Sequence, residues 1–306
     1  TQTIGKSTSR ESSITESTYR YGNLSSYVTL SYWATAGDHH HFKVLAGWQQ
    51  GQWDNKYYKA SRTRLTTNLP SLEVGDPSTQ KNSSWETEVK SMSLFGRFNY
   101  DYKEKYLVEA NIRYDGSSKF PNNSQWGFFP SASAAWRVSQ EKFWNVSPKA
   151  VSNLKLRASY GALGNSNVDP YTYLETFGLS TFGTGSGDAA RYLFGQAKLR
   201  YTSLPGQIPD NIGWETSKTF DVGLDAGFLN GRLNLTADYY IRKTVDMYTV
   251  GPTLPDTFGA TAPKGNYADM STYGYEIALS YNDSFKLAGK PFNFGIKATL
   301  ADYYSI

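Results

Sequence analysis

The sequence predicts an all-β fold: about ten strands of an antiparallel, up-and-down transmembrane β-barrel. Two observations lead to this class, namely unusually long stretches of period-two alternation and a regular exchange of short and long connections. The alternation is plainest between Trp214 and Tyr248, where each of two arms keeps it for about 12 to 16 residues. Strands of soluble proteins are most often about 5 or 6 residues long. A half-buried strand of this length indicates a bilayer.

The two arms of this stretch form a predicted hairpin with one apolar and one polar face. Asn230-Gly231 lies between them, and these residue types tolerate the positive φ angles of a type I′ turn. The polar face carries residues such as Thr236 and Arg242. The apolar face holds Phe220, Val222, Leu224, Ala226 and Phe228 in the first arm and Leu233, Leu235, Ala237, Tyr239 and Ile241 in the second.

The composition agrees with this reading and excludes several function classes. Aromatic residues make up 16% of the 306 residues, with 24 Tyr and 8 Trp, and mean hydropathy is -0.54. No run of about 18 apolar residues occurs, which excludes a transmembrane helix but not a barrel, whose strands are apolar only at alternate positions. The absence of Cys excludes disulfides and thiol chemistry. The net charge of +4 comes from scattered residues, so no nucleic-acid partner is predicted.

Further strands follow from the same alternation along the chain. The first 18 residues are polar and lack the pattern of a signal peptide, so we expect a removed signal or an internal piece of a longer chain. Long connections are expected over 51–86, 115–125, 164–213 and 251–269, and a helical turn is possible at 140–144. The predicted strands are 24–36, 42–48, 92–102, 106–114, 126–138, 154–162, the two arms of the hairpin, 273–281 and 292–300.

The connections alternate in length almost without exception. Short ones lie near Gly37, Glu104, Asn230 and Leu287, and the medium-length segment 139–152 falls in the same phase. Outer-membrane barrels have brief periplasmic turns and long extracellular loops. A soluble sandwich has no reason to place every long loop at one end.

No catalytic residue, metal site or cofactor is predicted. All three His residues lie in Asp38-His39-His40-His41, where at most His39 and His41 could share a metal, and a solvated turn explains the run without one. Asp221 and Asp225 could in principle serve a glycosidase, yet a water-facing strand gives the same spacing. The Gly-rich stretch 183–187 lacks the Lys-Ser/Thr of a phosphate loop.

Two sets of residues are candidates for contacts with a ligand or partner. Charged residues on the polar strand faces would line a watery lumen, and aromatic residues in the long connections would contact substrate or a partner. The lumen candidates are Arg97, Arg113, Arg137, Arg157, Asp221, Asp225, Arg232 and Asp238. The loop candidates are Trp53, Tyr57, Tyr58, Tyr171, Tyr173, Phe177, Phe182 and Tyr192.

Several segments resemble the SusC/RagA-type TonB-dependent outer-membrane transporters. Between Phe95 and Trp144 a Tyr-rich strand pair leads into an Arg-x-Asp-Gly-Ser-Ser-x-Phe loop, here Arg113 to Phe120, and then into a Trp-Gly-x-Phe-Pro-Ser strand at 126–131. The segments 154–165, 214–216, 228–247 and 266–281 continue the resemblance in order. It covers nearly the whole chain.

The resemblance implies a barrel of about 22 strands that holds a plug domain and imports a glycan, oligosaccharide or peptide. It also implies a SusD-like surface lipoprotein and the TonB complex as partners, a lipid bilayer around the barrel, and the outer membrane of a Gram-negative, Bacteroidetes-like bacterium. Ten strands cannot close such a barrel. We therefore expect residues 1–306 to be a portion of the barrel domain, with the plug outside this segment.

Two other functions remain open at this stage. A secreted carbohydrate-binding or adhesive β protein would share the aromatic composition, and detergent-free extraction would identify it. A glycoside hydrolase would require a pair of carboxylates essential for turnover.

Overall fold

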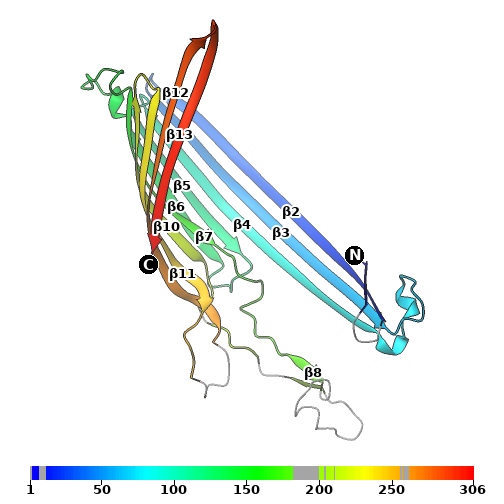
Figure 1. The fold of residues 1–306 in the computed structure, drawn as a ribbon. Helices are drawn as coiled ribbons and strands as arrows, with labels where there is room; N and C mark the ends of the chain where they lie inside the picture. Colours follow the sequence, from blue (N-terminus) through cyan, green and yellow to red (C-terminus); the bar gives the residue numbers. More distant parts are fainter. Residues whose placement is uncertain are drawn as a thin grey trace.

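The structure is a computed structural model that describes residues 2–6, 12–181, 200–202, 205–209, 211–255, 257 and 262–306. It confirms the all-β prediction. One antiparallel sheet of eleven strands runs in the order β1-β2-β3-β4-β5-β6-β7-β10-β11-β12-β13, and β8 pairs with β9 in a separate two-stranded sheet. Ten of the eleven are the long strands that the alternation predicts. In the described residues the two outermost strands, β1 and β13, do not pair with each other, so the sheet is a curved wall (Figure 1).

The strands differ greatly in length. Three short 3-10 helices, η1 (Leu72–Val74), η2 (Pro77–Thr79) and η3 (Val138–Gln140), lie in the connections, and η3 begins two residues before the predicted helical turn. Among the described residues, no helix is long and apolar enough to cross a membrane. The strands are β1 (Gln2–Lys6), β2 (Ser12–Ala36), β3 (His40–Thr63), β4 (Lys81–Tyr102), β5 (Tyr106–Ser117), β6 (Trp126–Trp136), β7 (Asn153–Asn165), β8 (Leu179–Thr181), β9 (Arg200–Thr202), β10 (Glu215–Phe228), β11 (Leu233–Val250), β12 (Lys264–Leu287) and β13 (Lys290–Ser305).

The short and long connections lie at opposite ends of the wall, as predicted. The turns after β2, β4, β10 and β12 share one end with the medium segment after β6, and the long connections after β3, β5, β7 and β11 share the other (Figure 1). We call these the turn end and the loop end. Because every strand is antiparallel to its neighbours, this arrangement follows directly from the order of connection lengths.

Each face of the wall keeps its character across strand after strand. On the outer face Leu156 pairs with Leu224, which pairs with Ala237 and then Ile277. On the inner face Ser159 pairs with Asp221. Register therefore adds the alternation of single strands into one apolar surface and one polar surface.

Aromatic rows border the apolar outer face. At the turn end His40, Tyr102, Tyr106 and Trp136 are successive cross-strand neighbours, and ring centroids of Tyr106 and Trp136 are 6.4 Å apart. Toward the loop end Tyr114 and Trp126 stack at 4.8 Å, with Trp126 opposite Gly116. The ten residues from Tyr106 to Gly116, at about 3.3 Å each and a tilt of about 40°, span about 25 Å, the height of a barrel's lipid-facing band.

The long connection predicted over 51–86 is wrong in most of its length. Strand β3 continues to Thr63 and β4 already begins at Lys81, so only 64–80 connect them. Residues 12–24, 52–63 and 81–90 of β2, β3 and β4 project past the end of β5, whose last paired residue, Ser117, lies opposite Ser91. We call this three-stranded extension the arm (Figure 1). Its alternation is polar on both faces because neither face meets lipid there.

The turn of the β10–β11 hairpin lies one residue earlier than predicted. Leu229 and Asn230 hold the central positions, with φ of 54° and 58°, and the amide of Gly231 donates to the carbonyl oxygen of Phe228 at 3.0 Å. The preceding connection holds this turn in place, since the amides of Leu229 and Asn230 donate to the carbonyls of Lys149 and Pro148. This contact compensates for a Leu residue at positive φ.

A small apolar core lies among the connections at the loop end. Phe120, Val168 and Ile212 are buried, and Tyr173, Ile208, Trp214 and Tyr248 pack against them. The hydroxyl of Ser124 donates to the carbonyl of Ile212 at 2.7 Å, which ties two of these connections together. The Phe of the Arg-x-Asp-Gly-Ser-Ser-x-Phe motif is thus the centre of a packed loop base.

Candidate functional site

The inner face holds two groups of polar and aromatic side chains that could receive a ligand. The first, which we call the loop-side pocket, encloses about 510 Å³ near the loop end. Its lining comes from β3, β4, β5 and the connections after β5 and β7, and includes Gln49, Trp53, Asn55, Arg113, Asp115, Lys119, Ser166 and Trp214.

The floor of the loop-side pocket is a fixed arginine. Phe95 lies flat against the backbone of Gly47, where a Cβ atom would come within 2.2 Å of its ring, and the guanidinium of Arg113 lies 5.6 Å from the centre of that ring. Nε of Arg113 donates to Oδ2 of Asp115 at 2.8 Å, and Nη2 donates to the hydroxyl of the buried Ser93 at 3.0 Å. Ring, carboxylate and hydroxyl together hold the cation in one orientation.

The rim of the pocket combines indole rings with an ammonium group. Trp53 projects from β3 and keeps 39% of its surface exposed. Trp214 is held by its indole N–H, which donates to the carbonyl of Gln125 at 3.0 Å, and Nζ of Lys119 donates to the carbonyl of Ser166 at 3.2 Å. An exposed ring beside fixed polar groups suits a ligand that has both flat apolar surfaces and hydrogen-bonding groups.

The second group lies nearer the turn end and is a network of ion pairs. Arg157 binds Asp225 through two hydrogen bonds of 3.0 and 3.1 Å, and its Nη2 lies 2.9 Å from Oδ1 of Asp238. Lys155 adds a longer contact of 3.6 Å to Asp225, and the hydroxyl of Thr236 donates to the same carboxylate at 3.3 Å. We call these residues the inner-wall ion cluster.

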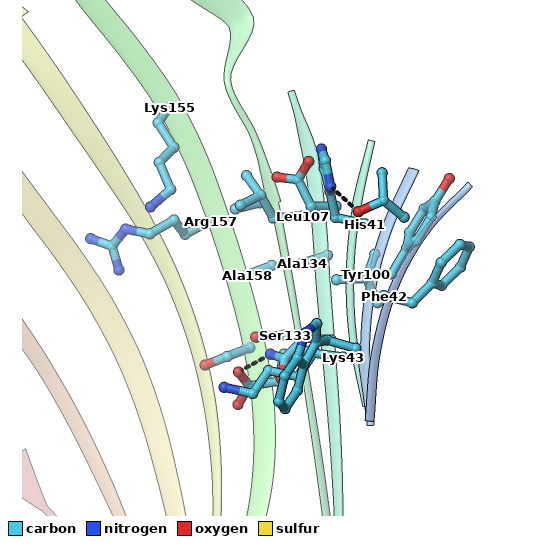
Figure 2. Close-up of a pocket in the computed structure, with 18 of the residues that line it drawn as sticks. His41, Phe42, Lys43, Tyr100, Leu107, Ser133, Ala134, Lys155, Arg157 and Ala158 are labelled. Atoms are coloured by element: carbon cyan, nitrogen blue, oxygen red, sulfur yellow. Dashed lines mark hydrogen bonds between the residues drawn. The ribbon is translucent and has the colours of Figure 1, made fainter. Parts of the chain in front are cut away.

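The inner-wall ion cluster borders a broader hollow of about 690 Å³ that extends across β2 to β10. Figure 2 shows Lys155 and Arg157 extending from β7 beside Leu107 and Ser133 of the neighbouring strands. Farther along, Nδ2 of Asn99 donates to Glu109 at 2.5 Å. Cations and carboxylates of this hollow are paired with one another, which suits a polar wall facing a second polar surface.

Six of the eight lumen candidates lie on the inner face. Arg97, for example, donates to Oδ1 of Asn111 at 2.7 Å. The prediction is wrong for Arg137 and Arg232, which lie at the turn end. β6 stops at Trp136, so Arg137 caps η3 and contacts Glu104 at 3.3 Å. Arg232 belongs to the β10–β11 turn and reaches Asp283 at 2.9 Å.

The aromatic candidates assigned to the first long loop lie on a strand instead. Trp53, Tyr57 and Tyr58 belong to the arm portion of β3, with Trp53 and Tyr57 on the inner face and Tyr58 on the outer. They were misplaced because the surrounding sequence carries no apolar alternation.

The other aromatic candidates lie in or beyond the loop base. The hydroxyl of Tyr171 accepts from the amide of Glu88 at 2.9 Å and also contacts its carbonyl at 3.2 Å. Tyr173 packs on the small core, and Phe177 is 65% exposed. Phe182 and Tyr192 lie outside the described residues, as does the Gly-rich stretch 183–187.

The His run and the paired carboxylates have structural partners. Nδ1 of His40 lies 2.9 Å from the Tyr100 hydroxyl, and Nδ1 of His41 lies 3.2 Å from that of Thr35. Asp225 is bound to Arg157. Within the described ranges, no group of three or more His, Cys, Asp or Glu residues is placed to hold a metal.

Sequence reasoning missed several residues of both groups. Gln49 and Asn55 share the inner-face parity of Trp53, and extending the alternation of β3 by five residues would have found them. Lys155 could have been found in the same way from Arg157. Lys119 and Trp214 carry no such signal, because the folding of the connections after β5 and β7 brings them to the pocket.

Comparisons with known proteins agree on one kind of barrel. A family model described as TonB dependent receptor-like, beta-barrel matches residues 2–305. TonB-dependent receptor P3 of Formosa agariphila is 32% identical over 87% of this chain and 26% of its own length. TonB-dependent receptor SusC of Bacteroides thetaiotaomicron is 30% identical over 86% of this chain and 25% of its own. The chain thus spans about a quarter of the length of these relatives.

A solved structure, the RagAB peptide transporter, superposes with a TM-score of 0.77 at 23% identity. The superposition covers 96% of this chain and 32% of that one. At this level of identity the likeness concerns the fold, and it reproduces the strand order and the curvature of the wall.

Proposed function

We propose, since this chain belongs to the TonB dependent receptor-like β-barrel family, that it forms part of the wall of a transporter that imports a bulky nutrient. The barrel lies in the outer membrane of a Gram-negative bacterium, and its family is one of receptors and transporters rather than enzymes. In this proposal residues 1–306 contribute about ten strands to a larger barrel of about 22.

The two faces support a role as barrel wall. The apolar band of about 25 Å between the aromatic rows matches the hydrocarbon region that a barrel must cover. The inner face carries the ion cluster and the loop-side pocket, so a polar solute and a plug domain would meet charged and hydrogen-bonding groups there. A TonB complex would supply the energy through the plug.

The loop-side pocket carries the proposal that the cargo is a glycan, an oligosaccharide or a peptide. Trp53 offers an exposed ring, and Arg113, Asp115 and Lys119 offer fixed donors and an acceptor beside it. Both cargo classes combine flat apolar surfaces with many hydrogen-bonding groups. The names of the relatives agree, since one is SusC and a similar structure is a peptide transporter. A SusD-like surface lipoprotein is the partner we propose at the loop end.

Uptake by the full-length transporter tests this proposal. Cells that carry the Trp53→Ala variant should need about tenfold more of a labelled oligosaccharide or peptide for half-maximal uptake, because base-like stacking of a flat group on an aromatic ring is worth about 1 to 3 kcal/mol. Tyr58→Ala is the matched control: it removes a ring of the same strand from the outer face, and should leave uptake unchanged.

Two outcomes would contradict the proposal. If neither panel of labelled compounds enters cells through the unmodified transporter, import is wrong. If Trp53→Ala and Tyr58→Ala behave alike, import stands but the loop-side pocket is not its binding site. Recovery of the protein in a detergent-free soluble fraction would favour the secreted carbohydrate-binding alternative.

A further inference from the structure

The arm has one open strand edge. Strand β4 pairs with β3 along its whole length, but its partner on the other side, β5, ends opposite Ser91. Residues 81–90 therefore have a free edge. In an antiparallel ladder the N–H and C=O of one residue point to the same side, and the sides alternate along the strand. Because Met92 and Leu94 face β5, the groups of residues 82, 84, 86, 88 and 90 face the open edge.

The first two of these edge residues are already bound in the manner of a neighbouring strand. The carbonyl of Lys90 accepts from the amide of Ser118 at 2.9 Å, and the amide of Lys90 donates to the Ser118 hydroxyl at 2.9 Å. The hydroxyl of Tyr171 bonds both the amide and the carbonyl of Glu88. Loop groups thus imitate a strand along this part of the edge.

Beyond Glu88 the edge is open. In the described part of the chain, no hydrogen bond reaches the edge-facing backbone groups of Asn82, Ser84 or Glu86. All residues from 81 to 86 are exposed. Three consecutive donor and acceptor pairs are therefore presented at the spacing of a strand, which is the arrangement that recruits a further strand.

An aromatic ladder on the inner face of the arm ends at the same edge. Tyr19, Tyr57 and Trp85 are cross-strand neighbours on β2, β3 and β4. The ring centroids of Tyr19 and Tyr57 are 4.4 Å apart, and those of Tyr57 and Trp85 are 5.7 Å apart. Trp85 is the last ring of the ladder, and 48% of it is exposed. Its second neighbour would be a side chain on a strand added to the edge.

We propose that residues 82–86 of β4 are a docking edge for an extended segment of a partner polypeptide, which adds a strand to the arm and places an aromatic side chain against Trp85. The edge lies about 20 to 30 Å of strand beyond the end of β5, outside the lipid-facing band. A cargo must leave this region through the lumen, whereas a partner protein can remain. The polypeptide is therefore a partner of the assembly and not the cargo.

Defined peptides test this in the full-length transporter in detergent or nanodiscs. The probe is an eight-residue peptide of alternating Thr and Tyr, whose Tyr side chains would lie on the Trp85 face and whose Thr backbone groups would bond the edge. N-methylation of the Thr residues removes those donors, and N-methylation of the Tyr residues removes only donors that face away. We expect saturable binding that weakens at least tenfold with N-methyl-Thr and little with N-methyl-Tyr.

Protein variants give the reciprocal test. Ser84→Pro removes one edge donor without affecting the bonds to β3, because the amide of Ser84 faces away from β3; Ser84→Ala keeps the donor. Ser84→Pro and Trp85→Ala should each weaken binding at least tenfold, and Ser84→Ala should leave it unchanged. Hydrogen exchange at Asn82, Ser84 and Glu86 should slow when the peptide binds, while exchange at Ser83 changes little.

Three results would overturn the proposal. These are an absence of saturable binding up to about 1 mM, equal binding of the two N-methylated peptides, or equal binding by Ser84→Pro and Ser84→Ala. Entry of the bound peptide into cells would show that the edge serves cargo rather than a partner. None of these results bears on Trp53, so nutrient import is tested separately.

Discussion

The two faces of the β10–β11 hairpin show how differently one strand pair can be stabilised on its two sides. On the outer face Leu224 meets Ala237 and Leu156, and every contact is apolar. On the inner face, one residue along, Asp225 is held by Arg157 and Thr236 through directed hydrogen bonds. The outer side depends on the medium that surrounds it, and the inner side depends on particular partners.

This difference predicts opposite sensitivities. A lipid-facing position accepts any apolar side chain of suitable size but no charge, because lipid offers no compensating group. An inner position accepts many polar side chains but responds to the loss of one partner of a pair. Three changes test this contrast, from the largest expected effect to the smallest.

The largest effect is expected for a charge on the outer face. Leu224→Arg should cost about 2 to 4 kcal/mol and reduce the folded fraction in the outer membrane, measured by heat-dependent gel mobility. Thr236→Arg, on the inner face of the next strand, should be tolerated because the new cation lies beside Asp225. Equal loss in both variants would mean that the apolar face does not meet lipid.

A smaller effect is expected when one partner leaves the inner-wall ion cluster. Arg157→Gln leaves Asp225 and Asp238 facing each other with only Lys155 nearby, and should lower the free energy of unfolding by about 1 to 2 kcal/mol, a value reduced by the partial exposure of the cluster. Urea unfolding in detergent measures it.

The control for that measurement neutralises the stranded acid. Adding Asp225→Asn to Arg157→Gln should restore part of the lost stability, because one uncompensated negative charge is removed. A double variant as unstable as the sum of its two single variants would show that the residues do not interact.

The smallest effect concerns Glu141, which lies at the turn end between the two faces. Hydrogen bonds from the Tyr106 hydroxyl, the Trp136 indole and the Lys105 ammonium lower the pKa of Glu141 from 4.5 to about 2. Its contribution to stability is therefore complete above pH about 4.5 and is lost as the pH falls toward about 2. Unfolding followed from pH 6 to 2 should show this loss in the native protein and a weaker pH dependence in Glu141→Gln.

Nutrient uptake should be insensitive to Glu141→Gln at neutral pH, since the side chain is far from the loop-side pocket. An unchanged acid dependence of unfolding in this variant would mean that other carboxylates dominate the pH response. In that event the contacts of Lys105 and Trp136 with Glu141 fix only the local turn.

The sequence predicted the wall where lipid demands alternation and failed where that demand ends. Leu224 and Asp225 fall on their predicted faces because a one-residue slip would bury one and expose the other. Trp53 and Tyr57 were assigned to a loop because the arm is polar on both sides, so periodicity carries no information there. Leu229 holds a turn position that residue preference gives to Gly, since contacts from Pro148 and Lys149 decide it.

The candidate site was predictable to the same extent. Arg113 and Arg157 could be assigned to the inner face by parity alone. Their partners on distant strands, such as the Asp225 carboxylate for Arg157, depend on strand register, which the sequence suggests only within a hairpin. Tyr171 could be named as a loop aromatic, but its bond to Glu88 required the folded connection after β7.

The flat rings of the inner face have a consequence for a moving solute. Phe95 lies on Gly47, and Phe129 lies on Gly164, where a Cβ atom would come within 2.0 Å of the ring. Without these glycines each ring would stand up from the sheet and obstruct the passage. The glycines therefore smooth the surface along which a large cargo must slide, so that its friction with the wall is set by ring faces rather than by protruding side chains.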